Sequence, residues 1–201
     1  QKSRKDAGPM DFSYTGYVRL LSLLRQHAYE IVDYHDYKDH PRCVILRHDI
    51  DTDLAQAVRF AELEADAGVR STYFVLLRTN FYNPASSGSL EQLHHIQSLG
   101  HEIGLHFDEK AYPDGTPEET VQRILKEREV LSALLETEAS TVSMHRPSQA
   151  TLDADLQIPG MVNSYGRTFS MISNTSPTAV ADGGNRWRRS SSPGHMTVCI
   201  S

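Results

Sequence analysis

Cysteine and long apolar runs are scarce in this sequence of 201 residues. With only two cysteines, Cys43 and Cys199, the chain is not a disulfide-rich secreted scaffold. Both lie in apolar runs typical of strands, which favours buried thiols in a reducing compartment over a single disulfide. No apolar run approaches the about 20 residues of a membrane-spanning helix, so we expect no membrane span.

An excess of positive charge is also absent, since the formal net charge is -6. This balance argues against a nucleic-acid partner, although Arg186, Arg188 and Arg189 form one local basic patch. The first twelve residues contain no apolar signal core, which favours a cytoplasmic location. We find no internal repeat, and 39% hydrophobic with 23% charged residues is typical of a globular protein. We therefore expect a single domain over residues 1–201.

Short strands and capped helices alternate along the first three quarters of the chain. The helical spacing of apolar residues predicts helices over 13–27 and 54–65. Capping residues predict two more, one from Ser89 to Gly100 and one that begins with a capping box at Thr116 and extends to Leu135. Short apolar or β-branched runs predict strands over 43–46, 71–77, 102–105 and 141–144. Beyond residue 157 the pattern weakens, and 161–165, 169–172 and 196–200 are predicted strands of a loop-rich barrel closure.

This order predicts an α/β fold with a parallel sheet, open or closed into a barrel. In such folds ligands gather at the carboxyl ends of the strands. Three of these four predicted strands, the first, third and fourth, are each followed there by polar side chains that can bind metal or move protons. These side chains are Asp49 and Asp51, then His106 and Asp108, then His145 and Arg146.

Imidazole nitrogens with carboxylate oxygens are the ligands that zinc and other first-row divalent metals prefer. Three protein ligands with an open position indicate a catalytic site, where the ion lowers the pKa of bound water to about 7. A second carboxylate can act as general base, held by an arginine. Asp49 and Asp51 thus provide one carboxylate for each role.

The same residues resemble the polysaccharide deacetylases, also called the NodB-homology domain or carbohydrate esterase family four. The resemblance covers about residues 43–148 and includes HDID at 48–51, STYFV at 71–75, GHEIGLH at 100–106 and HRPS at 145–148. It implies a distorted, incomplete (β/α) barrel with parallel strands. It also implies a metal-dependent hydrolase that removes acetyl groups from an N-acetylated sugar of a polysaccharide, glycolipid or glycosylated metabolite.

Carried over by position, the resemblance assigns the general base to Asp49 and a metal-binding carboxylate to Asp51. His106 resembles the first metal-binding histidine, and Arg146 resembles the residue that orients the base. The metal is zinc by preference, with cobalt, nickel or iron as alternatives. His101 matches a histidine that is usually structural, and we expect it to be buried and hydrogen-bonded.

The sequence departs from the family pattern at the second histidine of H-x-x-x-H, where Lys110 stands. We therefore expect the third ligand to be His145, which ends the next strand, with Asp108 as the alternative.

The family's late general-acid histidine is also missing from the last strand, as in a chain truncated at its C-terminus. His195 precedes that strand and would lie at the wrong end if the strand were parallel. Trp187 could stack on a sugar or belong to the core.

Three functions remain open at this point. The first is the metal-dependent deacetylase. The second is a degenerate domain of the same fold that binds carbohydrate without hydrolysing it, suggested by Lys110. The third is a phosphatase of the haloacid dehalogenase type, suggested by DIDTD at 49–53, in which Asp49 would be a nucleophile with magnesium. That motif needs threonine where Asp53 stands.

Overall fold

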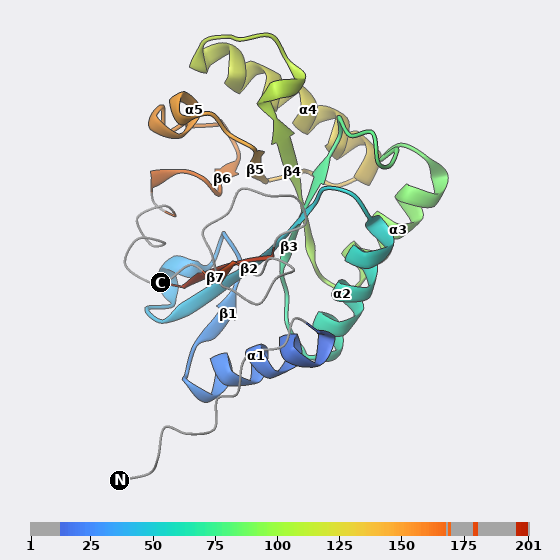
Figure 1. Cartoon of the computed structure of the whole chain (residues 1–201), viewed down its shortest axis with the longest axis vertical. Coiled ribbons are helices and arrows are strands. Elements are labelled where there is room, and N and C mark those ends of the chain that lie inside the picture. The colour runs from blue at the N-terminus through green and yellow to red at the C-terminus, as the bar shows by residue number, and fades with distance from the viewer. Residues whose placement is uncertain (1–12, 168, 170–178, 181–195, 201) are drawn as a thin grey trace.

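Helices and strands alternate along the chain in the order that the sequence predicts (Figure 1). The computed structural model describes residues 13–167, 169, 179–180 and 196–200. The helices are α1 (Tyr14–Gln26), α2 (Leu54–Asp66), α3 (Ser87–Ser98), α4 (Pro117–Leu135) and α5 (Gln149–Asp153), with short 3-10 turns η1 (Tyr37–Asp39) and η2 (Glu109–Ala111). The strands are β1 (Glu30–Val32), β2 (Cys43–Ile50), β3 (Thr72–Leu76), β4 (Glu102–Asp108), β5 (Thr141–His145), β6 (Val162–Asn163), β7 (Ala179–Val180) and β8 (Met196–Ile200).

The strands form one sheet in the order β6-β5-β4-β3-β2-β8-β7, and β1 also pairs with β2. Strands β1 to β6 are parallel to one another, and the sheet curls into an incomplete barrel. The predicted incomplete (β/α) barrel is thus confirmed. The last strand differs, because β8 runs antiparallel to β2 and β7 runs antiparallel to β8.

Local sequence sets most of the helix ends. Asp53 caps α2 by accepting hydrogen bonds from the backbone N–H groups of Ala55 and Gln56. The capping box predicted at Thr116 is present at the start of α4, with Pro117 in the first turn. Helix α3 begins slightly earlier than predicted because Ser86, not Ser89, provides its cap.

Alternation along the strands separates two faces of the sheet. One face packs against helices α2, α3 and α4, and its buried side chains form the largest core cluster, including Tyr73, Leu105 and Val142. The other face carries Ile45 and Phe74, which pack with Tyr34 and Phe169 in the barrel interior. The interior is crowded at Gly104, where a Cβ atom would clash with the Thr141 hydroxyl and the Phe74 ring.

Glu64 of α2 is a buried acid on the helix-covered side of the sheet. Its carboxylate accepts hydrogen bonds from the hydroxyls of Tyr17, Ser71 and Tyr73, the last at 2.7 Å, and lies 2.8 Å from His48 Nε2. Burial raises the pKa of Glu64, but the charge and hydrogen bond of His48 and the hydroxyl donors outweigh it and hold the pKa at about 2. The carboxylate therefore stays ionised and joins α1, α2, β2 and β3.

His101 completes this buried group, as the sequence predicts for a structural histidine. Its Nε2 lies 2.9 Å from the carbonyl oxygen of Ala61, and its Nδ1 accepts from the backbone N–H of Ser71 at 3.2 Å. Burial lowers the pKa of His101, so the neutral ring is favoured. We call Glu64, His48 and His101 the Glu64 cluster.

Candidate metal centre

Polar side chains occupy the interior face of the sheet at the carboxyl ends of β2, β4 and β5. The period of two places them together, because every second residue of a strand faces the same side. The sequence predicted that His106 and Asp108 follow a strand over 102–105. Strand β4 instead extends to Asp108, so both residues lie on the strand. The side chains concerned are Arg47, Asp49, Asp51, His106, Asp108, Ser143 and His145.

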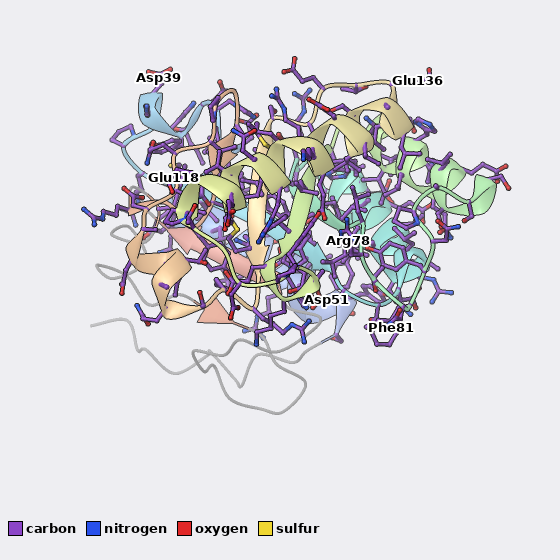
Figure 2. The ribbon with its side chains drawn as sticks, turned by 90° about the horizontal axis from the view of Figure 1, so that it is seen from above. Asp39, Asp51, Arg78, Phe81, Glu118 and Glu136 are labelled. Atoms are coloured by element: carbon purple, nitrogen blue, oxygen red, sulfur yellow. The ribbon has the colours of Figure 1, made fainter. Side chains whose placement is uncertain are left out.

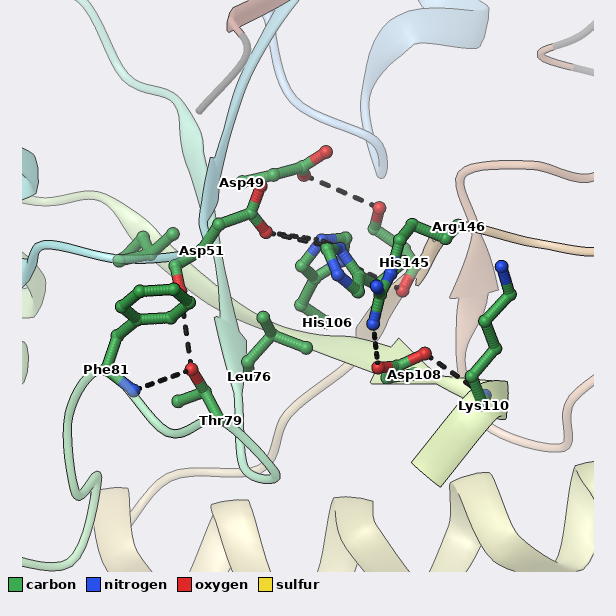
Figure 3. A network of polar contacts seen from close by, with 12 residues as sticks. Asp49, Asp51, Leu76, Thr79, Phe81, His106, Asp108, Lys110, His145 and Arg146 are labelled. Atoms are coloured by element: carbon green, nitrogen blue, oxygen red, sulfur yellow. Dashed lines mark hydrogen bonds and ion pairs between the residues drawn. The ribbon is translucent and has the colours of Figure 1, made fainter. Parts of the chain in front are cut away.

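Asp51, His106 and His145 meet at this edge, and we call them the Asp51 cluster (Figure 3). Asp51 Oδ1 lies 3.3 Å from His106 Nε2 and 3.2 Å from His145 Nδ1. The two ring nitrogens lie 3.2 Å from each other. All three side chains are nearly buried, and they come from three different segments of the chain.

The second ring nitrogen of His106 fixes the orientation of the imidazole. His106 pairs with Ser143 across β4 and β5, and its Nδ1 lies 3.3 Å from the Ser143 carbonyl oxygen. A carbonyl only accepts, so Nδ1 carries a proton, and in the neutral ring Nε2 keeps the lone pair that can bind an ion. Metal-binding histidines are commonly oriented by such a second bond.

The three donor atoms fit a divalent ion. They form a nearly equilateral triangle with sides of 3.2 to 3.3 Å. Ligands about 2.0 Å from a tetrahedral zinc ion lie about 3.3 Å apart, so the triangle has the size of one face of that tetrahedron. Two nitrogens and one carboxylate oxygen are also the donor types of zinc and similar ions.

Asp49 pairs with Arg47, two residues before it on β2 and on the same face. Arg47 Nη2 lies 2.7 and 2.5 Å from the two carboxylate oxygens of Asp49, and it donates to Ser143 Oγ at 2.5 Å. The guanidinium also lies 5.0 Å from the centre of the Phe74 ring and 5.2 Å from that of Tyr165. Burial disfavours the charged form of Arg47, but Asp49 together with Tyr34 and Tyr165 outweighs this and raises the pKa of Arg47.

Arg146 lies elsewhere than expected. The family resemblance pairs it with Asp49, whereas in the structure its Nη2 donates to Asp108 Oδ2 at 2.7 Å. The physical reason is that buried Arg47 already holds Asp49, while the half-exposed Arg146 follows β5 with a left-handed backbone at φ 49°. The expected Arg146–Asp49 pairing is therefore corrected to Arg47–Asp49.

Asp108 and Lys110 take part in a turn rather than in the Asp51 cluster. Asp108 Oδ1 accepts from the backbone N–H of Lys110 at 3.1 Å, and Oδ2 accepts from Arg146. Since both oxygens of Asp108 have other partners, the geometry favours His145 over Asp108 as the third ligand.

Two further expectations concern the C-terminal part of the chain. His195 and Trp187 lie outside the described residues. The premise that the last strand is parallel is wrong, because β8 is antiparallel and its first residue, Met196, pairs with His48. The beginning of β8 thus lies toward the carboxyl end of β2, which is the end that carries Asp49.

Arg47 and Ser143 are the residues that motif reasoning missed. Arg47 stands directly before HDID, and alternation in a strand puts residues 47 and 49 on one face. This pattern could have predicted the Arg47–Asp49 pair from the sequence. Alternation also puts Ser143 on the face of His145, but a serine within a strand is compatible with many roles.

Solved structures with this architecture are similar to the chain. The Streptococcus pyogenes deacetylase PplD, solved in complex with acetate, matches with a TM-score of 0.52 and 13% identity over 68% of this chain. The chain has the fold of a NodB-like deacetylase. IcaB from Ammonifex degensii shares this NodB-like fold, with a TM-score of 0.51 and 16% identity over 70% of each chain. The chain spans 65% of the length of PplD.

Comparisons with protein-family models and with curated proteins found no match. At such low identities the structural matches establish the NodB-like fold, and the activity must be argued from the side chains. Among the described residues, no helix is long and apolar enough to cross a membrane.

Proposed function

We propose that this protein is a divalent-metal-dependent deacetylase that hydrolyses the acetamide of an N-acetylated sugar. The observation that carries the proposal is the Asp51 cluster, in which three ligand atoms converge beside a second acid, Asp49, that has its own arginine. The NodB-like fold it shares with PplD, a deacetylase solved with acetate, supports the same reaction class.

Asp51, His106 and His145 are the residues that would hold the ion. A divalent ion bound there supplies a Lewis acid that polarises the amide carbonyl and acidifies water. Zinc is our first choice because of the donor set, with cobalt, nickel and iron as alternatives.

Asp49 is the proposed general base, which accepts a proton from the attacking water. A carboxylate does this best when its orientation is fixed, and Arg47 fixes that of Asp49 through contacts to both oxygens. Arg47 is itself held by Ser143 and by Ser164, whose Oγ lies 3.0 Å from Nη1. Two residues of the D-x-D motif therefore have different partners and, in this proposal, different roles.

The test combines metal analysis with acetate release from N-acetylglucosamine oligomers and a wider panel of acetylated sugars, with and without chelator. We expect the protein to lose activity with chelator and to recover it with zinc or cobalt. Asp49→Asn should abolish turnover and leave the metal content unchanged. Asp53→Asn is the matched control. Asparagine is also a good helix cap, and the carboxylate of Asp53 accepts hydrogen bonds from the first turn of α2.

Other results would contradict the proposal. A protein that binds these oligomers but no metal, and releases no acetate from the panel, would be the carbohydrate-binding domain instead. Loss of metal in Asp49→Asn would mean that the roles of Asp49 and Asp51 are exchanged. A phosphatase of the haloacid dehalogenase type has no support, because the fold is NodB-like and Asp53 acts as a helix cap.

A further inference from the structure

Phe81 is the most exposed large apolar side chain among the described residues, at 70%. It lies in the loop between β3 and α3, at the same edge of the sheet as the Asp51 cluster. Single exposed apolar residues are common on proteins, so exposure alone indicates no site. The surroundings of Phe81 are what distinguish it.

The loop is tied to the end of β2 on both sides of Phe81. Thr79 Oγ1 accepts from the backbone N–H of Phe81 at 3.2 Å and donates to the carbonyl oxygen of Asp51 at 3.4 Å. The hydroxyl of Tyr82 donates to the carbonyl oxygen of Ile50 at 2.7 Å and accepts from the backbone N–H of Leu76 at 3.1 Å. The residues that flank Phe81 are thus anchored at Ile50 and Asp51.

These anchors display the ring beside the candidate metal centre. Only the Thr79 hydroxyl separates the backbone of Phe81 from the backbone of the ligand Asp51. Figure 2 and Figure 3 both show Phe81 next to Asp51, and Figure 3 shows Arg146 and Lys110 on the opposite side of the histidines. The centre therefore has an apolar aromatic surface on one side and cationic side chains on the other.

We propose that Phe81 binds the apolar face of a sugar ring of the substrate while the acetamide lies at the Asp51 cluster. This inference rests on the proposed function and specifies how the substrate is held. A pyranose carries C–H groups on its faces and hydroxyls around its edge, so its face packs on an aromatic ring without desolvating the hydroxyls. The anchored loop lowers the entropy cost of that contact, because the backbone that carries the Phe81 ring is already fixed.

The contact is predicted to strengthen binding without changing the chemical step. Phe81 is anchored beside the cluster but supplies no group that holds metal or moves a proton. Its loss should therefore raise KM and leave kcat within about twofold, because uniform binding affects KM alone. We expect Phe81→Ala to raise KM about tenfold, and Phe81→Trp to stay within about threefold of the wild type.

The experiment measures both acetate release and direct binding of N,N′,N″-triacetylchitotriose by isothermal titration calorimetry. Binding is measured in the Asp49→Asn background, which prevents turnover during the titration. Val130→Ala is the matched control, because Val130 is also an exposed apolar residue, at 53%. It lies on α4 and does not belong to the Asp51 cluster. Thermal unfolding of each variant shows whether the fold is retained.

Weakened binding in Phe81→Ala, recovery in Phe81→Trp and no change in Val130→Ala would support the inference. Equal affinity of Phe81→Ala and its parent, or no binding of the oligomer by the parent, would overturn it. Failure of the proposed function has a different signature, since the oligomer would then bind in a Phe81-dependent manner without release of acetate by the metal-loaded wild type.

Discussion

The Asp51 cluster and the Glu64 cluster each contain one buried acid and two histidines, yet only the first has the geometry of a metal centre. Among the described residues, the Asp51 cluster is the group whose ligand atoms converge. In the Glu64 cluster, His101 Nδ1 is 3.9 Å from the carboxylate and both of its nitrogens have backbone partners. The residue types are the same, and the arrangement differs.

Hydroxyl donors explain this difference. Glu64 is surrounded by the hydroxyls of Tyr17, Ser71 and Tyr73, which complete the hydrogen bonding of a buried carboxylate. Asp51 instead faces two imidazole nitrogens that lie 3.2 Å from each other. An acid with two histidines therefore indicates a metal only when the ring nitrogens point at one position.

Removal of a proposed ligand should have the largest effect. We expect His145→Ala to lower kcat/KM by about 1,000-fold or more, because the ion supplies several kcal/mol of transition-state stabilisation. The measurement is steady-state acetate release at saturating zinc. His101→Asn is the comparison variant, expected to lower the melting temperature while the folded fraction keeps its metal. Full activity of His145→Ala would remove this histidine from the site.

Replacement of Glu64 should affect stability rather than metal binding. Glu64→Gln leaves an amide N–H facing the hydroxyl donors, and we expect the free energy of unfolding to fall by about 3 kcal/mol. Denaturant unfolding at pH 7 measures this loss. Metal content per folded chain should be unchanged, and its loss would mean that the two clusters are not independent.

The same carboxylate predicts a pH dependence. The pKa of Glu64 is lowered from 4.5 to about 2 in the folded protein, so the unfolded chain binds the extra proton first as the pH falls. The stabilisation is present above about pH 4.5 and is lost as the pH falls toward 2. Unfolding of wild type and Glu64→Gln between pH 2 and 6 should therefore converge at the acidic end. Parallel curves would contradict this.

Arg47 sharpens the comparison because it holds Asp49, the second acid beside the first cluster. Arg47→Lys should lower kcat about 100-fold, since one ammonium group cannot hold both oxygens of Asp49 and Ser143. Arg146→Lys should cost less than about threefold, because its half-exposed contact to Asp108 is weak. Metal-saturated kinetics of both variants decide which arginine serves the base, and a reversed order would restore Arg146.

Lys110 should have the smallest effect. It occupies the position of the family's second histidine, but its backbone N–H donates to the capping carboxylate of Asp108, and we assign no ligand role to its side chain. Lys110→Ala should keep acetate release and zinc affinity within about twofold of the wild type, as expected for a surface change. A larger loss of zinc affinity would make position 110 part of the centre.

The fold was largely predictable because its information is local. Alternating apolar runs and caps such as the Thr116 box mark each element, and their order implies parallel strands. The sequence also predicted that Asp51, His106 and His145 lie at the carboxyl ends of strands of one sheet, and the structure brings these three together. Their metal binding remains a prediction.

Contacts between distant segments were harder to predict. The motif resemblance gave Asp49 to Arg146, and nothing in the motif says that Arg47 reaches Asp49 first from the same strand. The length of β4 was underestimated because His106 and Asp108 are polar, although an interior face at a ligand site accepts polar residues. The direction of β8 depends on long-range pairing with β2, which no local pattern encodes.

Metal stoichiometry tests the central claim most directly. The protein is freed of metal, incubated with zinc, desalted and analysed by elemental analysis as wild type, His106→Ala and His101→Asn. The account predicts about one zinc per chain in the wild type and in folded His101→Asn, and less than about a tenth in His106→Ala. No zinc in the wild type, or equal zinc in wild type and His106→Ala, would contradict it.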